Sequence, residues 1–359
     1  MTRRSLTLLS ATLLAATRPV GAQSTDRSIE RWAASIAAAA ERIAAQVERR
    51  ANEVARRVER EFDEKSRRER AARDRWERND EADGEGQLSR IDTTFAFSAT
   101  GVVDLSVMSR DVIVTGWDRK EARVRAETER GRFDLDVSAS RLTLEQHGGG
   151  SNRDHRTITY EVMVPRGARV LVRSSSGDIE VRSAGGEVEA SSMSGDVRID
   201  DATARVEVGS ISGDVVIRRI KGRVEATTVS GSVEVEDIEG DLKAESTSGD
   251  VVVDQARGRD VELSTTSGDV SYAGAIEADG RYEFHSHSGT ITLAIPSASS
   301  ARFAIETFNG EIDSDFPVTL LPGERSLNRR PRRFEFAVGT GGPRIIAETF
   351  TGNVEIRKR

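Results

Sequence analysis

The sequence contains no cysteine, which excludes disulfide bonds, thiolate metal sites and lipidation at a leader cysteine. Aromatic residues make up only 5% of the 359 residues, so any core must consist mainly of Val, Ile, Leu and Ala. Such a core suits thin, repetitive layers better than a globule. No apolar run reaches the roughly 20 residues that a bilayer span requires. The formal net charge of −7 argues against nucleic acid as the main partner.

Residues 1–22 have the pattern of an export signal. Arg3 and Arg4 precede the apolar run LTLLSATLLAA, and the small residues of VGA provide a cleavage site after Ala22. The apolar run is too short for a membrane anchor. We therefore expect an extracytoplasmic protein, in the periplasm, on the cell surface or secreted. TRRSL weakly resembles a twin-arginine leader, so the export route stays open.

Residues 23–86 are expected to form a long, charged, amphipathic helix followed by a hinge at DGEG. From Ser24 to Asp83 there is neither Gly nor Pro, and Ala, Glu and Arg dominate. An apolar stripe recurs with an 11-residue period, which gives a nearly straight stripe. Its members are Trp32, Ile36, Ile43, Val47, Val54 and Val58. The segment 27–82 is either a solvated stalk, a coiled coil that mediates self-association, or a helix that docks on a partner.

From residue 87 to residue 359 the pattern changes to the alternation of strands, and one octapeptide recurs as SSSGDIEV, SMSGDVRI, SISGDVVI and further variants. Its glycines are spaced 18 to 21 residues apart. They are Gly177, Gly195, Gly213, Gly231, Gly249, Gly268, Gly289 and Gly310, with Gly352 two units further on, so one unmarked unit is expected near residue 331. This period predicts an all-β, β-helix-like solenoid with about 18–21 residues per rung.

The predicted interior consists of columns of equivalent apolar residues, because alternate side chains of a strand point to opposite faces. Pairs such as Val197 with Ile199 and Val215 with Ile217 form two columns, and a second strand in each unit adds Val188, Val206 and their equivalents. About fourteen rungs at about 4.8 Å make a rod on the order of 65 Å long. The closing VEIRKR is expected to place charge on the last exposed edge.

The candidate binding residues are polar rows that the repeat places on the surface. The hydroxyl rows comprise Ser174, Ser176, Ser192, Ser194, Ser210, Ser212, Thr228, Ser230, Ser246 and Ser248, and the carboxylate row comprises Asp178, Asp196, Asp214, Asp250 and Asp269. The residues between the paired hydroxyls, Met193, Ile211 and Val229, are expected to point inward. The hydroxyls either form a structural hydrogen-bonded ladder or a face that binds glycan, with ice as a remote option.

The carboxylate row stacks like charges one rung apart, which is unfavourable unless water or a cation intervenes. Calcium is the obvious cation, but the calcium-roll pattern G-G-x-G-x-D is missing, so neither metal nor cofactor is expected. His285 and His287 lack an evident third ligand. No nucleophile elbow or catalytic loop interrupts the rungs, so we expect no enzyme.

Residues from about 91 to 359 resemble the bacterial putative-adhesin domain family. The matching segments are DVIVTGWDR, YEVMVPRGARVLVRSSSGDIEV, the serial SGDV rungs, IPSASSARFAIETFNGEIDSDFPV and GTGGPRIIAETFTGNVEIR. The resemblance implies an extracytoplasmic β-solenoid without catalytic residues. The expected function is thus that of an exported, adhesin-like solenoid that binds or scaffolds an envelope component or glycan. A self-assembling rod and a polysaccharide-acting enzyme are the alternatives.

Overall fold

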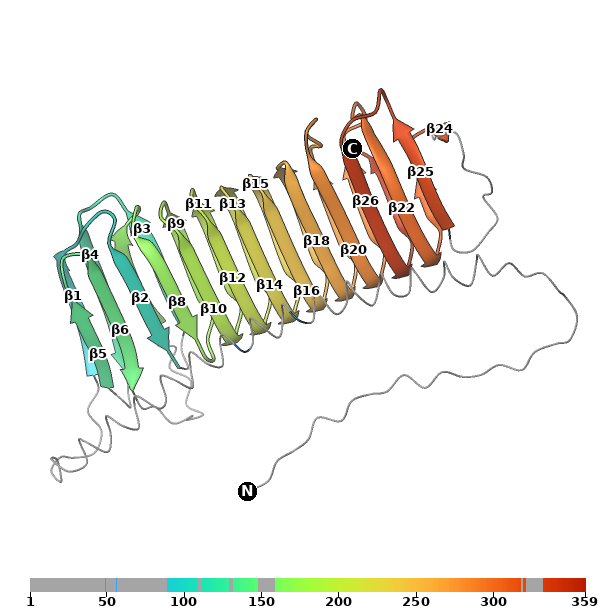
Figure 1. Cartoon of the computed structure of the whole chain (residues 1–359). Coiled ribbons are helices and arrows are strands. Elements are labelled where there is room, and N and C mark those ends of the chain that lie inside the picture. Colours follow the sequence, from blue (N-terminus) through green and yellow to red (C-terminus); the bar gives the residue numbers. More distant parts are fainter. Residues whose placement is uncertain are drawn as a thin grey trace, which may run out of the picture.

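The described residues of this computed structural model are 89–108, 111–128, 132–147, 159–317, 319–320 and 332–359, together with the helical Arg49 and Arg56. They form 27 strands in two sheets, here called sheet A (13 strands) and sheet B (14 strands). Figure 1 shows the strands stacked side by side along one axis as a rod. The all-β solenoid predicted from the repeat is confirmed.

The central part of the rod is a regular repeat in which odd-numbered strands belong to sheet A and even-numbered strands to sheet B. From β10 to β21 each strand pairs in parallel with the strand two before it, so that Val197, Val215 and Val233 lie opposite one another. The octapeptide recurs because every copy is one turn of the solenoid. The repeat strands are β8 (Arg169–Ser174), β9 (Ile179–Ala184), β10 (Val188–Ser194), β11 (Val197–Ala202), β12 (Val206–Ser212), β13 (Val215–Lys221), β14 (Val224–Ser230), β15 (Val233–Glu239), β16 (Leu242–Ser248), β17 (Val251–Arg257), β18 (Asp260–Ser267), β19 (Val270–Gly274), β20 (Arg281–Ser288) and β21 (Ile291–Ile295).

The core lies between the two sheets and is made of the predicted columns. In β13, for example, Val215 and Ile217 are fully buried, and Val206 and Val224 are buried in the facing sheet. A further interior column was not predicted: Ala184, Ala202, Ile220, Ile238 and Ala256 are also buried. Few aromatic rings are needed, because small aliphatic side chains fill the thin space between the two sheets.

A bend in each central strand of sheet A produces this further column. Ser183, Asp201, Arg219, Asp237 and Gln255 have φ between 55° and 59°, the left-handed region that non-glycine residues seldom adopt. Each of these residues drops out of the register, since Asp200 pairs with Arg218 and Ala202 with Ile220. Two consecutive side chains therefore point outward, and the next one returns to the interior.

At the N-terminal end of the rod, a rung formed early in the sequence lies between two rungs formed by later segments. Strands β2 and β3 lie between the rung β6–β7 and the rung β8–β9, while antiparallel strands β1, β4 and β5 complete the two edges. The strands of this end are β1 (Ser89–Ala96), β2 (Val102–Val107), β3 (Asp111–Trp117), β4 (Glu121–Thr128), β5 (Arg132–Val137), β6 (Arg141–His147) and β7 (Thr159–Pro165).

The C-terminal end repeats this arrangement. The last rung of the chain, β26–β27, lies between β20–β21 and β22–β23, so the chain leaves a gap after Ile295 and fills it with its final residues. The strands are β22 (Ala301–Asn309), β23 (Ile312–Ser314), β24 (Thr319–Leu320), β25 (Arg332–Val338), β26 (Arg344–Thr351) and β27 (Val354–Lys358).

Two expectations for this end were wrong. The unmarked unit near residue 331 is no parallel rung, because β25 pairs antiparallel with β22 and β24. VEIRKR is no exposed edge, because β27 has neighbours on both sides. The edges consist instead of the short strands β23 and β24, which expose few unpaired backbone groups.

The predicted signal peptide (1–22) lies outside the described residues. The predicted helix and hinge (23–86) also lie outside them, apart from Arg49 and Arg56. None of the described residues belongs to a helix with the length and apolar character of a membrane span.

Candidate binding surface at the Ser-Gly-Asp corner

Most turns of the repeat pass from sheet B to sheet A through a Ser-Gly-Asp corner, and Ser232 and Thr290 replace the aspartate at two of them. The last serine of the sheet B strand is exposed, and the aspartate that follows the glycine is exposed or half-buried. The outward serines of this row are Ser176, Ser194, Ser212, Ser230 and Ser248. The outward aspartates are Asp178, Asp196, Asp214, Asp250 and Asp269. These ten candidate residues are brought together in two neighbouring rows along one ridge.

The other five candidate residues were placed on the wrong face. Ser174, Ser192, Ser210, Thr228 and Ser246 are fully buried between the sheets, so they cannot contact a ligand from outside. Met193, Ile211 and Val229, which were expected inside, are instead half-buried on the outer face of sheet B. The inward side of β10 follows Val188, Ala190 and Ser192, which alternate regularly.

Two of these five hydroxyls, Thr228 and Ser246, and the buried hydroxyls of the rungs that follow form the structural ladder that was one of the interpretations. The Ser246 Oγ donates to the carbonyl oxygen of Gly231 at 2.9 Å, and the Thr265 Oγ1 donates to that of Gly249 at 2.9 Å. Each bond therefore reaches the glycine corner of the preceding rung. Ser192 and Ser210 have no hydrogen-bond partner for Oγ among the described residues. The ladder is consequently complete only from Thr228 onward, where Thr228 Oγ1 donates to Gly213 at 3.3 Å.

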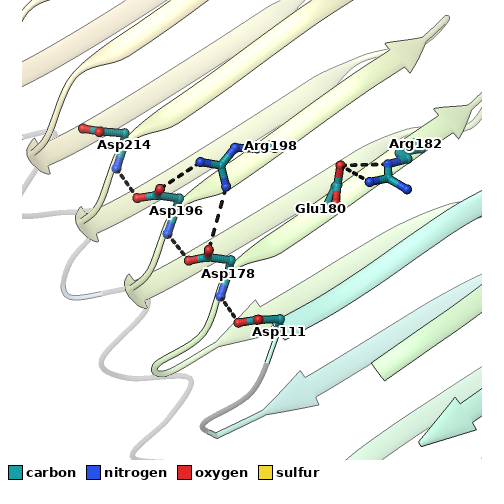
Figure 2. A network of polar contacts seen from close by, with 7 residues as sticks. All are labelled: Asp111, Asp178, Glu180, Arg182, Asp196, Arg198 and Asp214. Carbon is teal, nitrogen blue, oxygen red and sulfur yellow. Dashed lines mark hydrogen bonds and ion pairs between the residues drawn. The ribbon is translucent and has the colours of Figure 1, made fainter. Parts of the chain in front are cut away.

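The aspartate row forms a second ladder, shown in Figure 2. The backbone N–H of Asp178 donates to Oδ1 of Asp111 at 3.0 Å, that of Asp196 to Asp178 at 2.9 Å, and that of Asp214 to Asp196 at 3.0 Å. Ser232 takes its place in the same row, since its N–H donates to Oδ1 of Asp214 at 2.8 Å. One oxygen of each carboxylate is thus engaged with the rung that follows.

These contacts offset the repulsion between the stacked carboxylates. A backbone N–H bound to a carboxylate stabilises its charged form, and Arg198 adds a guanidinium 3.1 Å from Asp196 and 3.8 Å from Asp178. Within the described ranges, no group of three or more His, Asp or Glu side chains is arranged to hold a metal ion. The ladder itself therefore accounts for the row.

Further along the ridge the carboxylates lack such a counter-ion. Asp214, Asp250 and Asp269 have no basic partner within the described part of the chain, and all three are exposed. By contrast, the outer face of sheet A is covered by ion pairs such as Arg218 with Glu234 at 2.8 Å, a contact that raises the pKa of Arg218. This part of the ridge therefore carries three carboxylates that no described basic side chain neutralises.

The two histidines lie on the outer face of sheet B, on one side of β20 as expected. His285 Nδ1 lies 3.6 Å from Glu348 Oε2. His287 stacks on Phe350, and Phe350 stacks on Phe308, with centroids 5.3 and 4.9 Å apart and rings nearly parallel. Phe350 is thus stacked between the two other rings.

This aromatic column was missed in the sequence. The signal was present, because the tripeptide Glu-Thr-Phe occurs at 306–308 and again at 348–350, with its Thr and Phe at the first two positions of the Ser-x-Ser motif. A separation of 42 residues conceals that the two phenylalanines occupy adjacent rungs, which follows only from the insertion of β26 beside β22.

An open pocket of about 250 Å³ lies beside Gln255, the last of the left-handed residues in sheet A. It is lined by Gln255, Ala256, Arg257, Gly274, Ala275, Pro296 and Arg359. Arg359 is held by Asp254 at 2.7 Å. The lining has no acid beside a nucleophile, so its described residues do not assemble the elements of acid–base or nucleophilic catalysis.

Comparison with protein families matches residues 103–355 to the family described as Toastrack DUF4097, which includes the corner ridge and both inserted rungs up to Glu355. The chain belongs to the Toastrack DUF4097 family. The resemblance noted in the sequence is thereby confirmed. A comparison with curated proteins finds no match.

Three solved structures are similar to the chain. A putative cell adhesion protein from Clostridium sporogenes has 10% identity and a TM-score of 0.22, and covers 76% of this chain and 100% of its own. A putative adhesin from Bacteroides fragilis has 11% identity and a TM-score of 0.34, with 75% and 97% covered. A putative adhesin from Parabacteroides distasonis has 12% identity and a TM-score of 0.36, with 76% and 98% covered. At these values the similarity carries no information about function.

Proposed function

We propose that this Toastrack chain is an exported, non-enzymatic, adhesin-like solenoid that binds or scaffolds an extended component of the cell envelope. The observation that carries the proposal is the Ser-Gly-Asp ridge. A rigid stack repeats one hydroxyl at every rung and one carboxylate at most rungs, about 4.8 Å apart. Because the rungs are held in register by both ladders, the spacing is fixed before a ligand arrives, which lowers the cost of ordering on binding.

The chemistry of the ridge favours a polymer that carries both hydroxyl and ammonium groups, such as an amine-bearing envelope glycan or peptidoglycan. Asp214, Asp250 and Asp269 are exposed and have no basic partner among the residues that the structure describes. Ser212, Ser230 and Ser248 beside them can donate and accept hydrogen bonds. Each single contact is weak in water, but many equivalent contacts along one chain add up through effective concentration.

A retention assay tests the proposal. The chain from residue 23 is incubated with purified envelope fractions and peptidoglycan, and the triple variant Asp214→Asn, Asp250→Asn, Asp269→Asn is compared with it. Asparagine keeps the side-chain oxygen that accepts the inter-rung N–H and removes only the charge. The matched control carries Asp237→Asn, Glu239→Gln and Asp279→Asn, which change the net charge equally away from the ridge.

Retention of the parent chain and the control, with at least about tenfold weaker retention of the ridge variant, supports the proposal. No retention of the parent, or equal retention of all three proteins, contradicts it. Sedimentation of the same samples tests the alternative of a self-assembling rod, because that alternative requires particles larger than a single chain. Release of product from the glycan would point to the enzymatic alternative.

A further inference from the structure

The two ends of the rod differ in how their edge strands are built. At the C-terminal end the edges are β23 and β24, which have three and two residues, and Pro317 lies between them in the chain. At the N-terminal end the edge of sheet A is β1, an eight-residue strand without proline or a shift in register (Figure 1). Natural proteins commonly shorten or interrupt an edge strand that is to remain unpaired. The N-terminal edge of sheet A has neither of these two devices.

One side of β1 carries backbone groups that no described strand binds. Within the described ranges β1 pairs with β4 alone, and just after the strand the N–H of Phe97 donates to the carbonyl oxygen of Lys120 at 3.0 Å. Because hydrogen-bonded and non-hydrogen-bonded residues alternate in an antiparallel pair, the odd-numbered residues of β1 bind β4. Arg90, Asp92 and Thr94 therefore direct their N–H and C=O groups away from β4. These groups form a row to which a further strand can bind.

The apolar side chains of β1 are incompletely covered. Ile91 and Phe95 pack against the core but are only half-buried. On the neighbouring strand β4, by contrast, Ala122, Val124 and Ala126 are exposed by 1% or less. The apolar layer between the sheets is thus still accessible at this end of the rod. A strand added to β1 would cover it and remove apolar surface from water.

We propose that β1 pairs antiparallel with β1 of a second copy of this chain, about a two-fold axis through Thr93. In this register Ile91 lies opposite Phe95 of the second copy, and Asp92 lies opposite Thr94. Every inward side chain is opposite another inward one, as the pleat of the strand requires. The two rods then meet at their N-terminal ends, and sheet A continues from one chain into the other.

The neighbouring registers are less favourable. An axis through Asp92 would set its carboxylate opposite that of the second copy, and like charges in that position are destabilising. An axis through Thr94 would leave Arg90 and Ile91 beyond the end of the other β1 strand. The axis through Thr93 opposes no like charges, and Asp92 keeps its ion pair with Arg123 at 2.9 Å.

Sheet B is expected to oppose this contact rather than extend it. Its edge strand at the same end, β5, carries the exposed Asp134 and Asp136. A two-fold axis that relates two strands of one sheet is perpendicular to that sheet, so it also brings the two β5 strands toward each other. Their carboxylates repel, and salt screens this repulsion. The contact is therefore confined to β1, and added salt should strengthen it.

A two-fold contact is complete once two chains have joined. It therefore differs from the self-assembling rod considered above, which would grow by the addition of further chains. The inference does not rest on the proposed function, because β1 and the Ser-Gly-Asp ridge use different residues. Pairing of β1 and retention on envelope fractions can thus succeed or fail separately.

The absence of cysteine allows a direct test in the full chain. Thr93→Cys places one thiol on the axis, where opposite Cα atoms of a non-hydrogen-bonded pair lie about 4.5 Å apart, within the range of a disulfide. Arg90→Cys is the matched control on the same strand, because its two copies would lie about 20 Å apart. Ser314→Cys in β23 is the control at the opposite end of the rod. Each variant is oxidised gently, and linked dimers are quantified by non-reducing electrophoresis.

We expect Thr93→Cys to form at least about tenfold more linked dimer than either control, because only its two thiols lie within bonding distance. Equal amounts of dimer from all three variants, most dimer from Ser314→Cys, or no dimer from Thr93→Cys would overturn the proposal.

Thr94→Pro tests the contact without a thiol. It removes an N–H that points away from β4, so the hydrogen bonds between β1 and β4 are kept. Thr94→Val is the matched control, because it changes the same side chain and retains the N–H. Sedimentation should show pairs of chains for the parent and the control, and at least about tenfold weaker pairing for Thr94→Pro. Single chains in the parent, or pairing that survives Thr94→Pro as a coiled coil of residues 27–82 would, contradicts the contact.

Discussion

Replacement of the corner glycine Gly231 by alanine tests how tightly the rungs are stacked. Gly231 has φ of 151°, a conformation that L-residues rarely adopt. A Cβ at this position would lie 2.7 Å from the carbonyl carbon of Gly213 and closer still to its oxygen. Both atoms belong to the backbone of the preceding rung, so they can move only if the two rungs separate.

The expected loss of stability is the sum of two effects. The unfavourable φ costs about 1–2 kcal/mol, and the insertion of a methyl group into a packed region costs about 1–3 kcal/mol. We therefore expect Gly231→Ala to lower the free energy of unfolding by about 2–5 kcal/mol. The disturbance should be greatest in β12, β14 and β16, which meet at this corner.

Urea unfolding followed by circular dichroism measures the total effect, and hydrogen exchange locates it. Gly341→Ala is the matched control, because its φ is also positive, at 81°, while its nearest neighbour is Arg302 Cγ at 4.0 Å. The control should lose only the conformational contribution, about 1–2 kcal/mol. Equal losses in the two variants, or a loss below about 0.5 kcal/mol in Gly231→Ala, would refute the reasoning.

Four further predictions concern the ladders, the core and the inserted rung. Ser246→Ala should cost about 1 kcal/mol in urea unfolding because it removes a buried hydrogen bond, whereas Ser192→Ala should be nearly neutral because its Oγ has no described partner. Asp196→Ala should cost about 0.5–1.5 kcal/mol in the same assay, and Asp196→Asn less, because only alanine removes the acceptor for the next rung. Burial raises the pKa of Tyr272, so the folded state retains its proton above pH 10 while the unfolded state loses it. The free energy of unfolding should consequently fall as pH rises above about 10, and the fall should be smaller in Tyr272→Phe. Deletion of residues 344–359 should leave β20 and β22 without their shared neighbour, and limited proteolysis should then cut the chain after Ile295 faster than in the parent.

The repeat of the sequence predicts the solenoid and most of its core because the physical causes are local. Val197 and Ile199 alternate within one strand, and the 18-residue period places each above its equivalent in the next rung. The bend in sheet A also leaves a trace, since Asp200-Asp201-Ala202 breaks the alternation with two polar residues before a small apolar one. This break predicts a bend only if the second polar residue, Asp201, is allowed a left-handed backbone conformation.

Ten of the fifteen candidate surface residues lie outside as predicted, and the five that do not were misplaced for a physical reason. Ser192 has the same parity as Val188 and Ala190, so regular alternation places it inside. The apolar Met193 suggested the opposite assignment, because an apolar side chain was expected to face the core. It lies half-buried on the outer face of sheet B instead, and apolar character alone does not distinguish that face from the interior.

The order of the rungs at the two ends cannot be predicted from the local sequence pattern, because β26 has the same alternation as any other strand of sheet B. Its consequence concerns the biosynthesis of the chain. A protein that emerges N-terminus first leaves a vacant slot beside β20 until its last sixteen residues arrive, so a prematurely terminated product cannot close the rod. Both ends depend on segments that return from elsewhere in the chain, so we expect the fold to tolerate an added or removed repeat unit only between β8 and β20.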